Sequence, residues 1–221
     1  MVSYKRRLLV EGNDDGHVMR NLLRHHHVPG VLVGRDTDLT QDEIAIEIKG
    51  GKDALIASLP LLLDRGELEQ LAIIVDADLD VMACWQSVCH VLSQKGTVSL
   101  PSVPEPQGTV VTLQQNLHEV IVGIWIMPNN GLPGALEDFI AFLVPAGDAL
   151  WERARQCVNE IPAAGRRFPP ERQSKAEIHT WLAWQEEPGK PLGQAVTARY
   201  LDTQAPHAQQ LVAWLRRVFI V

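Results

Sequence analysis

The sequence predicts an α/β protein whose mostly parallel sheet is flanked by helices, and three observations lead to this fold class. Residues 71–75 form a continuous aliphatic run, as expected of a strand that is buried on both faces of a parallel sheet. Short apolar runs alternate with segments of helical periodicity over roughly the first 145 residues. Hydrophobic residues make up 46% of the 221 residues and charged residues 21%, a composition typical of a packed globular protein.

The expected elements follow one another as strand, turn and helix. Strands are expected at residues 7–10, 30–34, 44–48, 71–75 and 120–127, with an edge strand at 109–113. Helices are expected at residues 14–26, 52–63 and 81–94, and again from residue 135. From residue 151 onward the pattern is helical, with Pro-rich breaks. We therefore expect a sheet domain over residues 1–145 and a helical C-terminal extension, residues 146–221, packed on it.

Composition and charge exclude several classes of protein. The formal net charge of −7 argues against a broad nucleic-acid-binding surface, because phosphate contacts require clustered Lys and Arg. Any contact with DNA or RNA is therefore expected to be local and mediated by a metal ion. The N-terminal residues lack the apolar region of a signal peptide, and no apolar run reaches the length of a membrane span. We expect no membrane contact and a cytoplasmic location, and we leave the oligomeric state open.

Acidic residues follow two of the expected strands. Glu11, with Gly12 after it, ends the first apolar run, and Asp76 and Asp78 follow the run at 71–75. The carboxyl ends of parallel strands are where open α/β sheets bind ligands. If the backbone stays extended, alternation directs the side chains of Asp76 and Asp78 to the same side. Carboxylate oxygens are the ligands that hard cations prefer, so the pattern predicts a site for Mg²⁺ or Mn²⁺.

The same residues also have a simpler interpretation. Asp76, Asp78 and Asp80 could each cap the helix that follows, and Glu11 could open a turn. Each motif alone favours this interpretation. Taken together, however, the carboxylates of two strand ends repel one another unless a cation lies between them, which favours the metal site.

In these two motifs the sequence resembles the Toprim domain, which is shared by topoisomerases, bacterial primases and several nucleases. Glu11-Gly12 matches the glutamate and glycine that follow the first strand of that domain. Asp76-Ala77-Asp78 matches its Asp-x-Asp motif, and the resemblance covers approximately residues 5–145. The resemblance implies a Toprim fold, that is, a Rossmann-like sheet, and a metal-binding function for the domain at residues 1–145.

Two further segments look like a family of stand-alone Toprim proteins related to the OLD nucleases. They are residues 126–139, which contain Leu136-Glu137-Asp138, and residues 175–188, which begin with Lys175. In OLD-type nucleases an acidic pair in a Leu-Glu context adds ligands for a second metal ion, and a downstream lysine assists catalysis. The resemblance assigns these roles to Glu137 and Lys175. Because the sequence has no Walker-type GxxxxGK[ST] loop, any ATPase would be a partner protein.

The expected function is therefore Mg²⁺- or Mn²⁺-dependent hydrolysis of phosphodiester bonds in DNA or RNA at a two-metal site. The expected ligands are Glu11, Asp76 and Asp78 for the first ion, and Glu137 with Asp138 or Asp80 for the second. Glu11 and Lys175 are the expected catalytic residues. The lysine would neutralise charge that develops on the phosphate. For Glu137 and Asp138 the alternative is the preference of a helix first turn for acidic residues.

The alternative function is a non-catalytic Toprim-like module that binds metal or nucleotide and acts with a partner protein. The net acidity of the chain and the scarcity of arginine clusters favour this alternative. A third interpretation, a defence effector that requires an ATPase partner, is consistent with the missing Walker motif.

Other motifs in the sequence have ordinary structural interpretations. The histidines at 25–27 are consecutive and cannot converge on one ion, so they are expected at an exposed helix end. Trp181 and Trp184 are expected in a core or an interface. Residues 50–53, Gly-Gly-Lys-Asp, are typical of a turn and could also bind phosphate at a helix N-terminus. The three cysteines lack the spacing of zinc ligands and are expected to be small buried hydrophobic residues.

Overall fold

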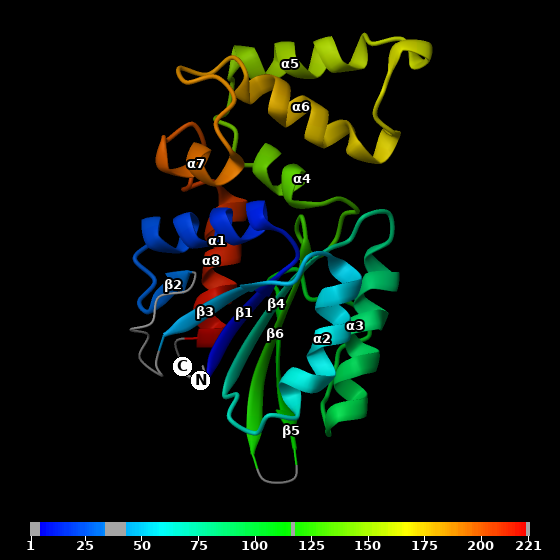
Figure 1. The fold of residues 1–221 in the computed structure, drawn as a ribbon, viewed down its shortest axis with the longest axis vertical. Coiled ribbons are helices and arrows are strands. Elements are labelled where there is room, and N and C mark those ends of the chain that lie inside the picture. The colour runs from blue at the N-terminus through cyan, green and yellow to red at the C-terminus, as the bar shows by residue number, and fades with distance from the viewer. Residues whose placement is uncertain (1–4, 34–42, 116–117, 220–221) are drawn as a thin grey trace.

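A computed structural model describes residues 5–33, 43–115 and 118–219 of the chain, and its centre is a six-stranded sheet (Figure 1). The strands are β1 (Arg6–Val10), β2 (Val31–Val33), β3 (Ile44–Ile48), β4 (Gln70–Asp76), β5 (Thr109–Gln114) and β6 (Glu119–Met127). Their order across the sheet is β2-β3-β1-β4-β6-β5, and every neighbouring pair is parallel except β5 and β6. The predicted α/β class and mostly parallel sheet are confirmed. Gly34, at the end of the strand expected at 30–34, lies outside the described residues.

Eight α-helices lie within the described ranges. They are α1 (Asn13–His25), α2 (Lys52–Leu63), α3 (Val81–Lys95), α4 (Leu136–Ala141), α5 (Ala149–Asn159), α6 (Gln173–Leu182), α7 (Leu192–Thr197) and α8 (Pro206–Phe219). Two short 3₁₀ turns, Ala163–Gly165 and Pro170–Arg172, lie between α5 and α6. None of these helices is long and apolar enough to cross a membrane.

Helices cover both faces of the sheet, and strict alternation along the strands explains why. Leu8 and Val10 of β1 belong to the core beneath α1 and α8, whereas Leu9 between them belongs to the core beneath α2 and α3. In β4, Ile74 and Val75 divide between the two cores in the same way. Strands of this kind must be apolar on both faces, which is why 71–75 is a continuous aliphatic run.

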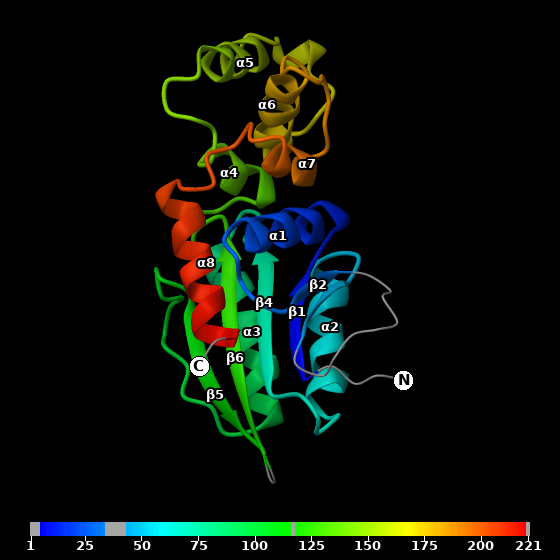
Figure 2. The same cartoon turned by 90° about the vertical axis from the view of Figure 1, so that its left-hand side faces the viewer.

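The C-terminal helix α8 lies directly on the sheet, beside α1 (Figure 2). The ring centroids of Trp214 on α8 and Trp125 on β6 are 5.5 Å apart. Gly123 on β6 allows this close approach, since a Cβ atom there would lie 2.3 Å from Cγ2 of Val218. The segment after residue 145 therefore shares the core of the sheet domain.

The helices α4 to α7 lie beyond the carboxyl ends of the parallel strands (Figures 1 and 2). α5 packs against α6, α6 against α4, and α7 against α1. The buried residues that hold this group of helices to the sheet include Phe139, Ile178 and Trp181. Trp181 is a core residue as expected, whereas Trp184 is 39% exposed. The helices α4 to α7 therefore form a layer over the edge of the sheet where the predicted carboxylates lie.

Two smaller expectations have mixed outcomes. Cys84 is buried, but Cys89 and Cys157 are only partly buried, and all three are free thiols. The histidines at 25–27 do lie at the end of α1, and two of them are exposed. The third, His26, places its Nε2 atom 2.8 Å from the carbonyl oxygen of Thr203 and ties α1 to the segment before α8.

Candidate metal centre

The candidate site begins where β1 and β4, which are neighbours in the sheet, end side by side. Asp76 is the last residue of β4, and Glu11 directly follows β1. The backbone amide of Asp76 donates a hydrogen bond of 2.8 Å to Oε1 of Glu11. The backbone carbonyl of Glu11 accepts from the amides of Gly50 and Gly51, at 2.8 and 3.1 Å. Glu11, which follows β1, is thus held at the carboxyl ends of three parallel strands, β1, β3 and β4.

Asp15 is a carboxylate of this site that was not predicted from the sequence. It is the third residue of α1 and caps that helix, since its Oδ2 accepts from the amide of Gly12 at 3.1 Å. The residue is buried, and its Oδ1 has no hydrogen-bond partner within the described part of the chain. The signal in the sequence was weak, because an acidic residue in a first helical turn is ordinarily a cap.

Asp78 differs from the sequence-based expectation in its backbone. The chain does not stay extended after Asp76, because Asp78 has a φ of 53°. An isolated antiparallel bridge to Gly134 holds it there, with N···O distances of 2.9 and 2.8 Å. Its exposed carboxylate accepts a hydrogen bond from Nζ of Lys52 in the first turn of α2. Asp76 and Asp78 are therefore not equivalent: one is half-buried at the strand end, and the other is exposed and paired.

Glu137 and Lys175 meet at the same edge, although they are far apart in the sequence. Glu137 is buried in the first turn of α4, and Nζ of Lys175 on α6 lies 2.7 Å from its Oε1. This hydrogen bond raises the pKa of Lys175, and Asp14 in the first turn of α1 adds to the effect. The lysine assigned by resemblance thus contacts the glutamate assigned by resemblance.

Five carboxylates at this edge affect one another's ionisation. Burial, which is the largest cause, and the charges of Asp15, Glu11, Asp78 and Glu137, in that order, together raise the pKa of Asp76 to about 9. Burial also raises the pKa of Asp15 to about 6. The pKa of Glu11 is raised by burial as well, against the hydrogen bond from the Asp76 amide. We call these five residues the carboxylate cluster: Glu11, Asp15, Asp76, Asp78 and Glu137.

Two of the predicted ligands have capping roles in the structure. Asp80 is the N-cap of α3, and its Oδ1 accepts from the amide of Ala83 at 2.9 Å. Oδ2 of Asp138 accepts from the amide of Ala135 at 2.8 Å and from Oγ of Ser174 at 3.2 Å. Neither residue is among the groups that raise the pKa of Asp76 most strongly. Their contacts are those of helix-capping residues, and their role as metal ligands stays a prediction.

The chemistry of the cluster fits a hard divalent cation. Its donors are all carboxylate oxygens, and the Oδ1 atoms of Asp76 and Asp15 are buried with no hydrogen-bond partner among the described residues. In the conformation described, no group of three or more His, Cys, Asp or Glu side chains within residues 5–33, 43–115 and 118–219 is arranged to hold a metal ion. Instead, Lys52 pairs with Asp78 and Lys175 pairs with Glu137.

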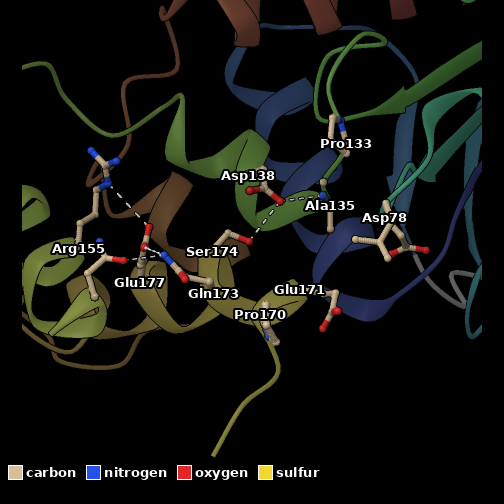
Figure 3. A pocket seen from close by; sticks show the side chains of 13 residues that line it. Asp78, Pro133, Ala135, Asp138, Arg155, Pro170, Glu171, Gln173, Ser174 and Glu177 are labelled. Atoms are coloured by element: carbon tan, nitrogen blue, oxygen red, sulfur yellow. Dashed lines mark hydrogen bonds and ion pairs between the residues drawn. The ribbon is translucent and has the colours of Figure 1, made fainter. Parts of the chain in front are cut away.

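Two pockets adjoin the cluster, and Asp78 lines both of them. The larger, of about 590 Å³, lies between α4, α5 and α6 (Figure 3). The smaller, of about 460 Å³, is lined by the first turn of α2, including Gly51 and Lys52. Neither pocket was predicted from the sequence, apart from the expectation that residues 50–53 could bind phosphate. A ligand with its charged group at the cluster would therefore have space on either side.

The fold and the site together define an α/β protein with a carboxylate cluster at the carboxyl edge of a parallel sheet, covered by a helical layer. The chain belongs to a family described as a protein of unknown function (DUF3226), whose sequence model matches residues 5–220. Comparison with curated proteins and with solved structures gives no match.

Proposed function

We propose that this protein is a Mg²⁺- or Mn²⁺-dependent nuclease of the Toprim class, related to the OLD-type nucleases, that hydrolyses phosphodiester bonds of DNA or RNA. The observation that carries the proposal is the buried Oδ1 atom of Asp76, which lies among four other carboxylates with no donor in the described residues. A carboxylate in such surroundings either keeps a proton or binds a cation. A divalent ion bound there would activate water and offset charge on the phosphate.

The order and position of the two motifs also support the Toprim class. Glu11 follows β1, the Asp76-Ala77-Asp78 motif follows β4, and these strands are parallel neighbours. Glu11, Asp15 and Asp76 are the proposed principal ligands. Asp78 and Glu137, the other two members of the cluster, are each paired with a lysine.

The two lysines have a further role in this proposal. In the absence of a cation, Lys52 and Lys175 neutralise Asp78 and Glu137, and both hydrogen bonds raise the pKa of the lysine concerned. Once a cation takes over those carboxylates, the ammonium groups become available to the phosphate on either side of the cluster. Lysine is a point-charge donor suited to phosphate oxygens. A local binding site of this kind is compatible with the net charge of −7.

Thermal melting and one gel assay test the proposal. Mg²⁺ or Mn²⁺ should raise the melting temperature relative to EDTA, because it relieves the repulsion within the cluster. Plasmid DNA, single-stranded DNA and RNA should be tested separately, and at least one should be cleaved only with the metal. Glu11→Gln keeps the side-chain shape and should abolish cleavage. Lys175→Met should lower cleavage by about tenfold or more without losing stabilisation by the metal.

The matched control is Lys95→Met, which breaks a surface ion pair of 2.8 Å with Asp64 at the opposite end of the sheet. This variant should leave both the stabilisation by metal and the cleavage of nucleic acid unchanged. No stabilisation by either metal would refute the metal centre itself.

A second function, a metal- or nucleotide-binding module that acts with a partner protein, is favoured by one observation. Lys52 and Lys175 are held in ion pairs with Asp78 and Glu137, so neither ammonium group is available to a scissile phosphate in this conformation. Stabilisation by metal with no cleavage of any of the three substrates would select this function.

A further inference from the structure

The larger pocket beside Asp78 is built by the helical layer and not by the sheet. Its far wall consists of side chains from two facing helices, Arg155 and Asn159 on α5 and Gln173 and Glu177 on α6 (Figure 3). Its near wall is formed by Asp78 and the segment that leads into α4. The pocket therefore extends from the carboxylate cluster into the space between the helices.

The far wall holds a fixed network of polar groups. Nε2 of Gln173 donates both to Oε1 of Glu177, at 2.9 Å, and to Oδ1 of Asn159, at 2.8 Å. Glu177 is buried, and its Oε2 lies 3.8 Å from Nε of Arg155. These contacts orient hydrogen-bond donors and acceptors on one surface before any ligand arrives, which is what specific recognition of a polar ligand requires.

The charge of the pocket limits what it can hold. Four carboxylates line it, those of Asp78, Asp138, Glu171 and Glu177, against the one guanidinium of Arg155. A phosphate placed in the pocket would be repelled, whereas an uncharged polar group with N–H donors would not. The phosphate and its bound cation belong at the cluster, and the pocket suits an uncharged part of the same ligand.

Apolar side chains also line the pocket. Leu79, Pro133 and Pro170 line it, and Leu79, which directly follows Asp78, is 73% exposed. Enzymes that act on nucleotides read a base by hydrogen bonds to its edge and by apolar contacts to its faces. The pocket offers both kinds of contact, and its volume of about 590 Å³ is within the range of pockets for small ligands.

We propose that this pocket binds the nucleoside attached to the phosphate at the carboxylate cluster, so that the helical layer gives the site its preference among bases. This inference rests on the proposed function, because it takes a phosphate at the cluster as its starting point. Glu177 and Asn159 are the specificity residues, and Leu79 contacts a face of the base.

Calorimetric titration of the full-length protein in Mg²⁺ tests this inference. The probes are the four ribonucleoside 5′-monophosphates, ribose 5-phosphate and inorganic phosphate. At least one nucleotide should bind about tenfold tighter than ribose 5-phosphate, as expected of one or two additional hydrogen bonds to the polar groups of the pocket wall. Glu177→Gln and Asn159→Ala should each remove most of that difference. Glu186→Gln, an exposed glutamate on the same helical layer, is the matched control and should not affect it.

A second measurement does not depend on the variants being folded. In the ¹⁵N-labelled wild-type protein, the side-chain amide signals of Gln173 and Asn159 should shift with the nucleotide and not with ribose 5-phosphate. Nucleotides that bind no tighter than ribose 5-phosphate would overturn the inference. So would a preference that survives both pocket variants together with unmoved amide signals.

Stabilisation by Mg²⁺, measured separately on the same samples, distinguishes failure of the pocket from failure of the metal centre. Where Mg²⁺ stabilises the protein, the nucleotide titrations decide on the pocket alone. Where it does not, adenosine, cytidine, guanosine and uridine are titrated without metal, because the contacts to the base do not require the ion. Binding of a nucleoside that Glu177→Gln weakens would support the pocket, and no binding of any of the four would overturn it.

Discussion

Asp76 combines a buried carboxyl group with a position among other carboxylates. It ends the most buried strand of the sheet, so its carboxyl group lies at the border of an apolar core. Its amide hydrogen bonds to Glu11, while its own Oδ1 has no donor within the described ranges. Burial of an unpaired charge is costly, and folding alone therefore favours the protonated form of this residue.

The raised pKa values of Asp15 and Asp76 lead to a prediction about pH. In the metal-free protein these values are about 6 and about 9, whereas both groups titrate near 3.8 without the fold. The folded protein thus keeps protons that the unfolded chain releases. Both contributions to stability are complete below about pH 4; that of Asp15 is lost as the pH rises to about 6, and that of Asp76 as it rises to about 9. The free energy of unfolding should fall by about 1.4 kcal/mol per pH unit for each such proton.

Thermal melts in EDTA and in Mg²⁺ between pH 6 and 8.5 provide the measurement. Because Mg²⁺ competes with protons, the increase in melting temperature that it causes should grow with pH. Asp76→Asn should remove most of this dependence, and Asp64→Asn, which alters a carboxylate paired with Lys95, should keep it. A metal effect of the same size at every pH would contradict the role given to Asp76.

At the scale of elements, α1 and α8 decide how the sheet is covered. The N-terminal turn of α1 brings Asp15 to the cluster, and α8 packs beside α1 over β4 and β6. α8 can approach this closely because Gly123 on β6 has no side chain, and the indole ring of Trp214 lies over it. The packing of α8 is therefore part of what holds α1 in place.

Gly123→Ala tests the packing of α8. The added Cβ would lie 2.3 Å from Val218 Cγ2 and 3.0 Å from the Trp214 ring, so α8 must shift. Overpacking of this kind costs about 1–3 kcal/mol of unfolding free energy, which denaturant titration can measure. Gly165→Ala, in an open 3₁₀ turn with no atom within 4 Å of the new Cβ, should change stability by less than about 0.5 kcal/mol. Equal effects of the two substitutions would show that the contact is not tight.

At the scale of the whole molecule, the sheet and the helices after residue 145 share one core. The buried side chains of α8 are Ala208, Leu211, Val212, Trp214, Leu215, Val218 and Phe219. Burial of each large apolar side chain contributes about 1.5–3 kcal/mol, and net stability is only about 5–15 kcal/mol. The sheet domain therefore depends on the C-terminal helix.

A fragment of residues 1–145 should accordingly fail to fold. It lacks α8, and Trp125 and its neighbours on that face of the sheet would be exposed. We expect no cooperative thermal transition and no near-ultraviolet circular dichroism from its tryptophans, in contrast to the full chain. A cooperative transition in the fragment would instead mean that residues 146–221 are an independent addition.

The sequence by itself determined the elements and the residues at their ends. Apolar alternation is a local property, so the run at 71–75 and the acidic residues Glu11 and Asp76 after strands could be located without a structure. The predicted central strand is confirmed as β4, since it lies between β1 and β6 in the middle of the sheet.

Only the tertiary structure decided which of these side chains meet. Asp15 looks like a cap until α1 is packed against the strand ends, and Lys52 looks like part of a turn until Asp78 bends towards it. The pairing of Lys175 with Glu137, and the pocket between α5 and α6, join segments that no local pattern relates. The physical reason is that burial and charge at this edge depend on how separate layers pack, and packing is a property of the whole chain.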